Sequence, residues 1–316
     1  MNRRTFATTT AGAALSAMAA DKPNVPIIDT HIHLFDPTRK EGIPWPPKTN
    51  EKLYKPSLPD RYRKLTASLG VVGAIKVEAS PWLEDNQWVL DLIANEPLIV
   101  GFIGNLDVGK PDFQKNFDRF HKNPLFLGIR NGNLWDRNFR TNITSPAFIA
   151  DLKTLAAAGL TMDTANPNPA LVEDLLHLTD KVPELRLVID HLPQLAVPAG
   201  GAELKAYEAN LEKFRTRKQV YVKISSVLRK VNDRVPTDLA FYKPRLDQLF
   251  DVFGQDRVVF GSDWPNSDNW AEYPAVLKIV TEYFATKPQA VQEKYFWKNS
   301  VAAYRWKKRA ATQPSL

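Results

Sequence analysis

IIDTHIH, at residues 27–33, is an apolar, β-branched stretch that ends in two histidines separated by one residue. In a β-strand, side chains two positions apart project to the same face, so His31 and His33 are expected to point the same way. At the end of a strand, two such imidazoles can bind one divalent ion. The stretch therefore predicts a first strand carrying a metal-binding pair, with two histidines satisfied by protein groups as the alternative interpretation.

Seven more apolar runs follow this stretch at a mean spacing of about 33 residues, the length of a strand, a helix and two loops. Each run is nearly continuous in apolar character, as in parallel strands that are covered on both faces. The eight runs are Ile27–Phe35, Val71–Ala79, Ile99–Leu106, Phe126–Arg130, Leu160–Thr164, Leu185–His191, Val220–Ser225 and Val258–Asp263. They predict an α/β fold, a single (β/α)8 TIM-like barrel with its site at the C-terminal ends of the strands. A doubly wound open sheet is the alternative, but no Gly-x-Gly-x-x-Gly follows any run.

Helix boundaries can be predicted between the runs. Ser145 and Asn168 each precede a proline and a periodic apolar segment, which is typical of an N-cap followed by proline at the first helical position. Gly254 follows another amphipathic segment and predicts its C-terminal end. The proline-rich stretch Asp36–Pro59, which contains Trp45, is expected either to form a pocket wall or to be a rigid surface loop.

Composition limits the possible classes of partner. The chain has 316 residues, 44% of them hydrophobic, and a formal net charge of +7. Its lysines and arginines are spread along the sequence without a basic stripe, which argues against nucleic acid as a partner and allows a small, anionic substrate. No apolar run is long enough to predict a membrane-spanning helix. The oligomeric state is left open.

The chain contains no cysteine. Disulfides, thiolate nucleophiles and cysteine-bound zinc are therefore excluded. Any metal must be held by histidine and carboxylate ligands.

Residues 1–20 are predicted to be an export signal rather than part of the fold. Arg3 and Arg4 precede a weakly apolar segment, and AMA at residues 17–19 supplies a cleavage pattern of small residues. This arrangement is typical of a twin-arginine signal and predicts a periplasmic location, with residues 21–316 as the folded domain. A disordered tail rich in alanine and threonine is the alternative.

Two strand ends carry the side chains best suited to catalysis. Asp263 closes the eighth run within GSDWP, residues 261–265, and a carboxylate placed there must be paired or hydrogen-bonded. It is predicted to act as general base and metal ligand, with an N-cap or turn carboxylate as the alternative. His191 ends the sixth run and is predicted to bind metal or polarise a carbonyl. A histidine bonded to a loop carbonyl is the alternative.

Other strand ends offer further candidates. Glu78 ends the second run and is a candidate metal ligand or substrate contact, with a salt-bridged rim residue as the alternative. Arg130 ends the fourth run and can clamp a carboxylate or carbonyl, or form an ion pair at the barrel top. Asp163, at the end of the fifth run, is a weaker candidate for substrate binding. Three tryptophans follow strand ends and are candidates for an apolar pocket lining: Trp82, Trp135 and Trp264.

Together, DTHIH at residues 29–33, DHLP at 190–193 and GSDWP at 261–265 resemble the amidohydrolase-2 family, in its lactonase-like branch. The resemblance covers about residues 26–306. It implies a distorted (β/α)8 barrel. His31 and His33 match the family's first-strand pair, His191 its sixth-strand histidine and Asp263 its eighth-strand aspartate.

Two departures from the family pattern narrow the expectation. No lysine ends the fourth run, so a binuclear site bridged by a carbamylated lysine is not expected. No histidine ends the fifth run, where decarboxylase relatives carry a ligand, and Asp163 stands there instead. The resemblance thus implies one divalent metal, with zinc as the first candidate and metal-free operation as the alternative.

These observations predict a hydrolase that opens a lactone, a cyclic ester of a sugar acid or an aromatic acid, by attack of an activated water. Zinc would be held by His31, His33 and Glu78, and would lower the pKa of the water or polarise the carbonyl. Asp263 would transfer the proton, while His191 and Arg130 would orient the substrate. A non-oxidative decarboxylase and a non-catalytic exported barrel that binds a sugar or a metal are the alternatives.

Overall fold

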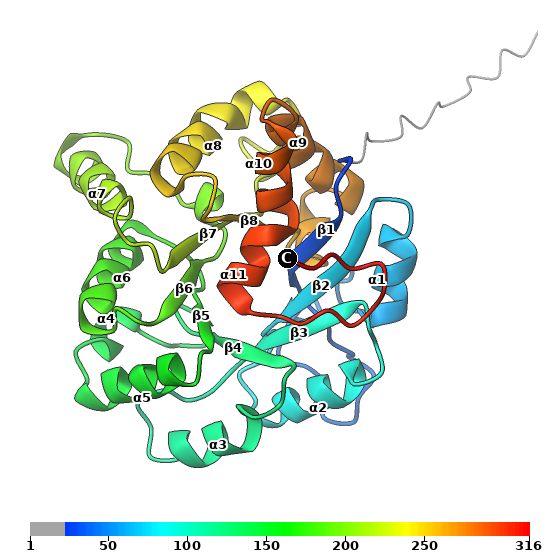
Figure 1. The fold of residues 1–316 in the computed structure, drawn as a ribbon, viewed down its shortest axis with the longest axis vertical. Helices are drawn as coiled ribbons and strands as arrows, with labels where there is room; N and C mark the ends of the chain where they lie inside the picture. The colour runs from blue at the N-terminus through cyan, green and yellow to red at the C-terminus, as the bar shows by residue number, and fades with distance from the viewer. Residues whose placement is uncertain (1–22) are drawn as a thin grey trace, which may run out of the picture.

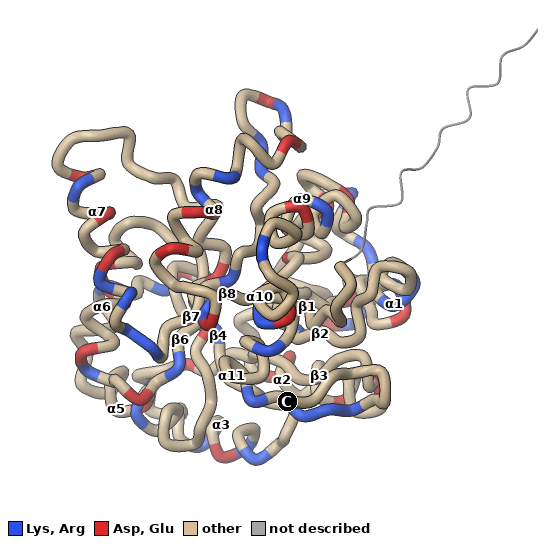
Figure 2. Tube along the Cα trace, turned by 45° about the horizontal axis from the view of Figure 1, so that its top comes forward, with Lys and Arg blue, Asp and Glu red and all other residues tan. Residues whose placement is uncertain are grey.

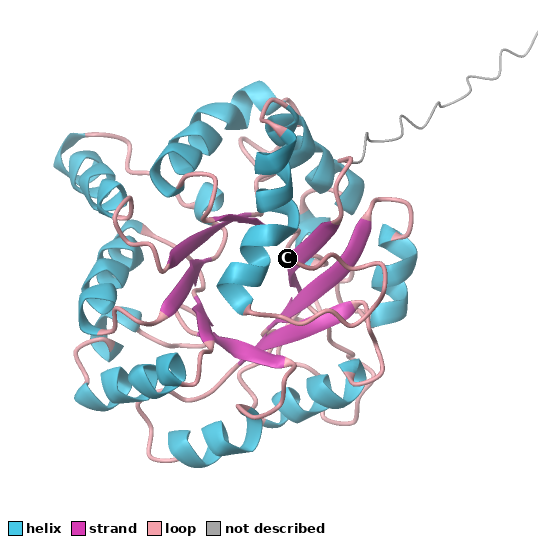
Figure 3. Ribbon diagram, viewed as in Figure 1, coloured by secondary structure: helices cyan, strands magenta, loops and turns pink. Residues whose placement is uncertain are grey.

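Each predicted run contains a strand, and the strands pair in chain order. The computed structural model describes residues 23–316, in which eight parallel strands alternate with helices around a nearly closed barrel (Figures 1 and 3). The strands are β1 Ile27–Ile32, β2 Val71–Val77, β3 Ile99–Gly104, β4 Phe126–Arg130, β5 Thr161–Asp163, β6 Arg186–Ile189, β7 Val220–Ile224 and β8 Val258–Phe260. The predicted (β/α)8 fold is confirmed.

The last strand meets the first through the residues that follow it. The backbone amide of Asp263 donates to the His31 carbonyl at 2.8 Å, and that of His33 donates to the Trp264 carbonyl at 2.7 Å. Gly261 permits this approach, because a Cβ at that position would lie 2.8 Å from the Cβ of His31. Closure therefore sets the two motifs furthest apart in the chain side by side.

The helices surround the barrel (Figure 3). They are α1 Pro59–Thr66, α2 Glu84–Ile93, α3 Phe113–Phe120, α4 Phe139–Asn142, α5 Pro146–Ala157, α6 Pro169–Lys181, α7 Gly201–Lys213, α8 Leu239–Phe253, α9 Tyr273–Ala285, α10 Gln289–Glu293 and α11 Asn299–Tyr304, with short 3-10 or π turns η1 Leu192–Gln194, η2 Asn266–Asn269 and η3 Lys294–Lys298. Basic and acidic residues are both scattered over the surface elements (Figure 2).

The predicted helix boundaries are observed. The side chain of Ser145 accepts from the Phe148 amide at the start of α5, and Asn168 caps α6 in the same way. These caps satisfy amides that have no partner within the helix. Helix α8 ends at Gly254, whose φ of +68° is the left-handed conformation that glycine adopts without strain.

The C-terminal segment closes the end of the barrel opposite the site. Trp297, Tyr304 and Trp306 pack against apolar side chains that fill the barrel interior, including Ile28 and Val188. In Figure 1, α11 lies across the ring of strands. The interior is therefore a packed core, and only the C-terminal ends of the strands remain to form a cavity.

The predicted export signal, residues 1–20, lies outside the described residues. Within residues 23–316, no helix has the length and apolar character needed to cross a membrane.

Candidate active site

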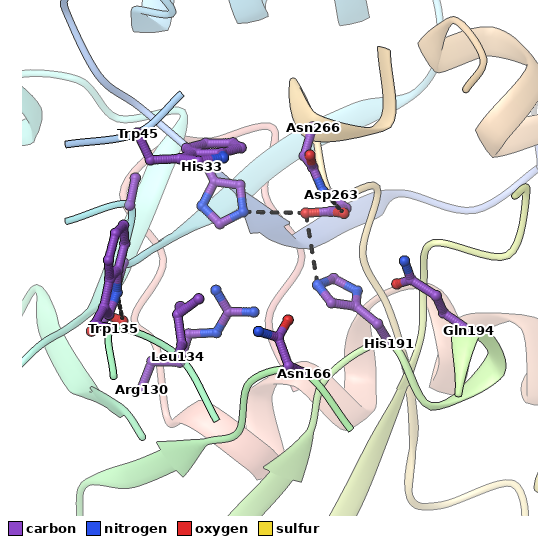
Figure 4. Close-up of a pocket in the computed structure, with 12 residues that line it drawn as sticks. His33, Trp45, Arg130, Leu134, Trp135, Asn166, His191, Gln194, Asp263 and Asn266 are labelled. Carbon is purple, nitrogen blue, oxygen red and sulfur yellow. Dashed lines mark hydrogen bonds and ion pairs between the residues drawn. The ribbon is translucent and has the colours of Figure 1, made fainter. Parts of the chain in front are cut away.

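A cavity of about 200 Å³ opens at the C-terminal ends of the strands (Figure 4). Six residues predicted for the site line it: His33, Glu78, Arg130, Trp135, His191 and Asp263. Trp45, from the proline-rich stretch Asp36–Pro59, also lines it. Its ring meets that of His33 at a centroid distance of 5.3 Å. Of the two interpretations of that stretch, the pocket wall is the one that the structure supports.

The carboxylate of Asp263 is the point where the histidines meet. Its Oδ1 lies 3.2 Å from Nε2 of His33, and 3.7 Å from Nε2 of both His31 and His191. All four side chains are nearly inaccessible to solvent. Asp263 and His191 both adopt left-handed φ angles, 63° and 53°, in sharp turns after their strands. Such conformations are unfavourable for residues other than glycine, and here they turn both side chains toward the cavity.

The second carboxylate oxygen of Asp263 is held by neutral donors. Ser226 donates to Oδ2 at 2.7 Å and Asn266 donates at 2.8 Å. Burial alone would raise the pKa of Asp263, but His191, the hydrogen bond with His33 and the other imidazoles lower it well below its usual range. Asp263 is therefore an ionised and firmly oriented carboxylate at neutral pH.

Burial leaves His191 uncharged, in contrast to Asp263. Removal from water disfavours the imidazolium and lowers the pKa of His191 to about 4, although Asp263 and Asp190 act against this shift. Its Nδ1 lies 2.8 Å from the Ser225 hydroxyl, which fixes the ring. At neutral pH His191 is an uncharged imidazole that faces the cavity.

A buried lysine beneath the site was missed by sequence reasoning. Lys223, in β7, has no exposed side-chain surface, and its Nζ lies 2.5 Å from Asp163 Oδ2, 3.0 Å from Asp190 Oδ1 and 3.1 Å from His31 Nδ1. Asp190 also pairs with Arg130, its Oδ2 lying 3.0 Å from the Nε atom. The available signal was a lysine inside an otherwise apolar strand, where an unpaired charge would be very costly.

Asp163 belongs to this buried network and does not line the cavity, contrary to its predicted contact with substrate. Its carboxylate accepts from Lys223 and from the Tyr304 hydroxyl, the latter at 3.0 Å. Its side chain faces the barrel interior, so it is fully buried.

Glu78 lies at the cavity wall and not among the histidines. Its Oε1 accepts from Nε1 of Trp135 at 2.8 Å and from Nη1 of Arg137 at 3.3 Å. Arg137 was not predicted, because the bend of the loop after β4 is what brings it back to Glu78. Among the described residues, the group of side chains that could hold a metal with His31 and His33 includes Asp263 and not Glu78.

Two of the three predicted tryptophans lie away from the cavity. Trp82 is 39% exposed on the loop after β2, with its amide bonded to Ser80. Trp264 is buried behind the site, where its ring packs against Tyr62 and under Arg61. A residue next to a strand end can point away from the barrel mouth, and sequence spacing does not determine which way it points. Of these three tryptophans, Trp135 is the one that lines the cavity.

The chain resembles known proteins over most of its length. The model of the amidohydrolase family matches residues 28–306. The chain belongs to the amidohydrolase family. It is similar to an L-fucono-1,5-lactonase from Burkholderia ambifaria, with 28% identity over 240 residues, 76% of this chain and 80% of that protein. It is also similar to one from Burkholderia multivorans, with 25% identity over 87% of this chain and 94% of that protein.

Solved structures share the fold of this amidohydrolase. A zinc-bound amidohydrolase from Burkholderia multivorans superimposes with a TM-score of 0.77 and 21% identity, covering 90% of this chain and all of that one. A 5-carboxyvanillate decarboxylase from Novosphingobium aromaticivorans superimposes with a TM-score of 0.61 and 16% identity, over 89% of this chain and 96% of that one. At these identities the likeness concerns the barrel alone.

The donor set of this amidohydrolase fits a divalent metal. Among the described residues, His31, His33 and Asp263 each offer a donor atom within 4.8 Å of the others. Nδ1 of His33 lies 3.1 Å from the Val77 carbonyl, which can only accept, so Nε2 of the neutral ring carries a lone pair. That lone pair faces Asp263 Oδ1 at 3.2 Å, so a proton or a metal cation is needed between the two atoms.

His31 can also bind a divalent metal, in one of its two tautomers. Its Nε2 is buried without a hydrogen-bond partner in the described structure, 3.7 Å from Asp263 Oδ1. Nε2 can bind a cation when Nδ1 carries the proton, and Asp190 Oδ1, 3.6 Å from Nδ1, is placed to attract it. A charged Lys223 that donates to Nδ1 favours the other tautomer. Metal binding thus requires the Nδ1-protonated form of His31.

Proposed function

We propose that this amidohydrolase hydrolyses lactones. The observation that carries the proposal is one small cavity in which an ionised carboxylate, a neutral imidazole and a guanidinium converge. These groups belong to Asp263, His191 and Arg130 (Figure 4). Lactone opening needs a proton acceptor for water and a donor for the developing oxyanion, and these groups supply both roles. The two L-fucono-1,5-lactonases similar to this chain support the same reaction class.

Asp263 is the proposed general base. Water attacks the carbonyl carbon while Asp263 takes its proton. The ring C–O bond then breaks, and Asp263 returns the proton to the leaving alkoxide oxygen. Ser226 and Asn266 hold Oδ2 throughout, which fixes the direction of the carboxylate. A carboxylate of low pKa is a weak base, so its contribution depends on this fixed position beside the bound ester.

Arg130 and His191 are the proposed groups that orient the carbonyl. The Nε of Arg130 donates to the Thr164 carbonyl at 3.0 Å and lies 3.0 Å from Asp190 Oδ2. Its terminal nitrogens point into the cavity toward His191 and Asp263 (Figure 4). A guanidinium anchored at one edge can donate to a developing oxyanion without moving. His191 Nε2 faces the same space and adds a neutral donor or acceptor.

The proposed cofactor is one zinc ion held by His31, His33 and Asp263. Bound zinc would polarise the lactone carbonyl or lower the pKa of a coordinated water. The support is the His2Asp donor set, the partnerless Nε2 of His31 and the lone pair of His33 that faces Asp263.

Export to the periplasm is a separate proposal that rests on the sequence alone. The adjacent Arg3 and Arg4 before a weakly apolar segment support it. Fractionation of expressing cells should recover the protein with periplasmic markers, and recovery with cytoplasmic markers alone would contradict the proposal.

The lactonase proposal is tested with a panel of substrates. Purified protein of known metal content is mixed with L-fucono-1,5-lactone, unsubstituted δ-valerolactone and 2-pyrone-4,6-dicarboxylate, and acid release is followed with a pH indicator. We expect saturable hydrolysis of at least one lactone above its spontaneous rate, with a turnover on the order of 1–10³ s⁻¹. Spontaneous rates across the whole panel, or carbon dioxide release from an aromatic acid without ring opening, would exclude lactone hydrolysis as the activity.

A further inference from the structure

One wall of the cavity is polar and contributes nothing to the proposed reaction itself. This polar wall consists of the lining residues Glu78 and Trp135, with Arg137 bound to Glu78 behind them. Glu78 is 2% exposed, at the end of β2, and its carboxylate lines the cavity. Nε1 of Trp135 donates to Oε1 at 2.8 Å, while Nη1 of Arg137 lies 3.3 Å from Oε1 and 3.5 Å from Oε2. Among the described residues, Oε2 thus has only the long contact with Arg137 and keeps lone pairs for another donor.

The loop that carries the polar wall adopts an unfavourable backbone conformation. Trp135 and Asp136 are consecutive residues with φ angles of 59° and 57°, in the left-handed region that residues other than glycine rarely adopt. Arg137 then donates to the Arg130 carbonyl at 3.3 Å, which ties the loop back to β4. The bend directs the indole of Trp135 at Glu78. Strain of this kind is typical of functional sites, where it fixes a side chain in place.

The charges around the cavity disfavour an anionic substrate. Arg137 is committed to Glu78, and Arg130 is held through Nε by Asp190, so only its terminal nitrogens, assigned above to the ester carbonyl, offer positive charge to a substrate. The carboxylates of Glu78 and Asp263 both face the cavity. A substrate bearing additional carboxylates would approach the carboxylates of Glu78 and Asp263. Ring hydroxyls, in contrast, are donors that a carboxylate binds strongly.

We propose that Glu78 determines specificity by accepting hydrogen bonds from substrate hydroxyls, so that the enzyme selects neutral, polyhydroxylated lactones over carboxylated ones. This inference rests on the proposed lactone hydrolysis. It replaces the expectation of an anionic substrate and assigns Glu78 to substrate binding instead of the metal.

The test is a selectivity ratio, kcat/KM for L-fucono-1,5-lactone divided by kcat/KM for δ-valerolactone, which has no hydroxyl. Glu78→Gln keeps the size of the side chain but removes its charge and one acceptor. We expect the ratio to fall by ~10-fold to 100-fold, since a site built to bind hydroxyls loses its preference when that group is removed. Glu84→Gln, the same change on an exposed α2 carboxylate paired with Arg119, is the control and should keep the wild-type ratio.

A second variant covers the case in which Glu78→Gln fails to fold. Trp135→Phe keeps an aromatic ring but removes the donor to Oε1, and should lower the same ratio by about threefold, the loss of one neutral hydrogen bond. An unchanged ratio in folded variants overturns the inference while leaving lactone hydrolysis intact. If Glu78→Gln lowers kcat/KM equally for both lactones and also loses bound metal, Glu78 is a metal ligand, and the inference is overturned as well. If wild-type protein hydrolyses neither lactone, the proposed function fails first.

Discussion

Asp263→Asn should lower kcat/KM for lactone hydrolysis by about 10³-fold, within the range for loss of a general base. The amide matches the carboxylate in shape and can still bond with Ser226 or Asn266, but it cannot take a proton from water. It also removes the negative charge that the three histidines surround. Steady-state kinetics with circular dichroism of the same samples would separate loss of catalysis from loss of fold.

A matched control is available for this substitution. Asp118→Asn makes the same change on an exposed residue of α3 whose carboxylate lies 4.0 Å from His121. It should retain the wild-type rate. An Asp263→Asn variant that is folded and within threefold of wild type would show that another group accepts the proton.

Lys223→Met should destabilise the protein by about 3–5 kcal/mol, the cost typical of removing one partner from a buried ion pair. Lys223 is the ammonium shared by Asp163 and Asp190, and none of the three side chains has exposed surface. Without it, two carboxylates remain in the barrel interior, and Arg130 and the Tyr304 hydroxyl are among the donors left to them. Urea unfolding monitored by tryptophan fluorescence measures the change.

A double variant distinguishes charge from packing in this network. Lys223→Met with Asp163→Asn removes one cation and one anion together, so it should recover part of the stability lost in the single variant. If Lys223→Met unfolds at the wild-type urea concentration, the buried lysine is not needed to neutralise the carboxylates.

The fold could be predicted because each signal in it is local. Continuous apolar runs identify strands that are covered on both faces, and a capping residue before proline identifies a helix start, as at Ser145 and Asn168. Their regular alternation leaves few possible topologies. The closure of β8 onto β1 also follows from eight such units, and it brings Asp263 to His31 and His33.

The composition of the cavity could be predicted only in part. His33, His191, Arg130 and Asp263 end or follow strands, so the barrel topology alone directs them to its mouth. The barrel topology does not determine where the side chains of loop residues point. Trp264 turns away from the cavity and packs against Tyr62 of α1, while Trp135, with its positive φ, places its indole at the cavity.

The buried network was less accessible to sequence reasoning. A lysine within a strand is compatible with an exposed edge as well as with a buried ion pair, and only the pairing of strands decides between them. In the structure Lys223 lies beside Asp163 and Asp190, which come from β5 and from the turn after β6. The candidate metal-binding group joins His31 and His33 with Asp263, which the sequence also suggested as a ligand, and does not include Glu78.

The most direct test of the account is isotopic. Wild-type protein and L-fucono-1,5-lactone are mixed in ¹⁸O-labelled water, and the acid product is examined by mass spectrometry before spontaneous hydrolysis contributes. Attack of water at the carbonyl predicts one ¹⁸O atom in the carboxylate and none in the released hydroxyl, formed at the enzymatic rate in wild type and near the spontaneous rate in Asp263→Asn. Label in the hydroxyl instead, or no product above the spontaneous rate in wild type, would contradict the proposed role of this cavity.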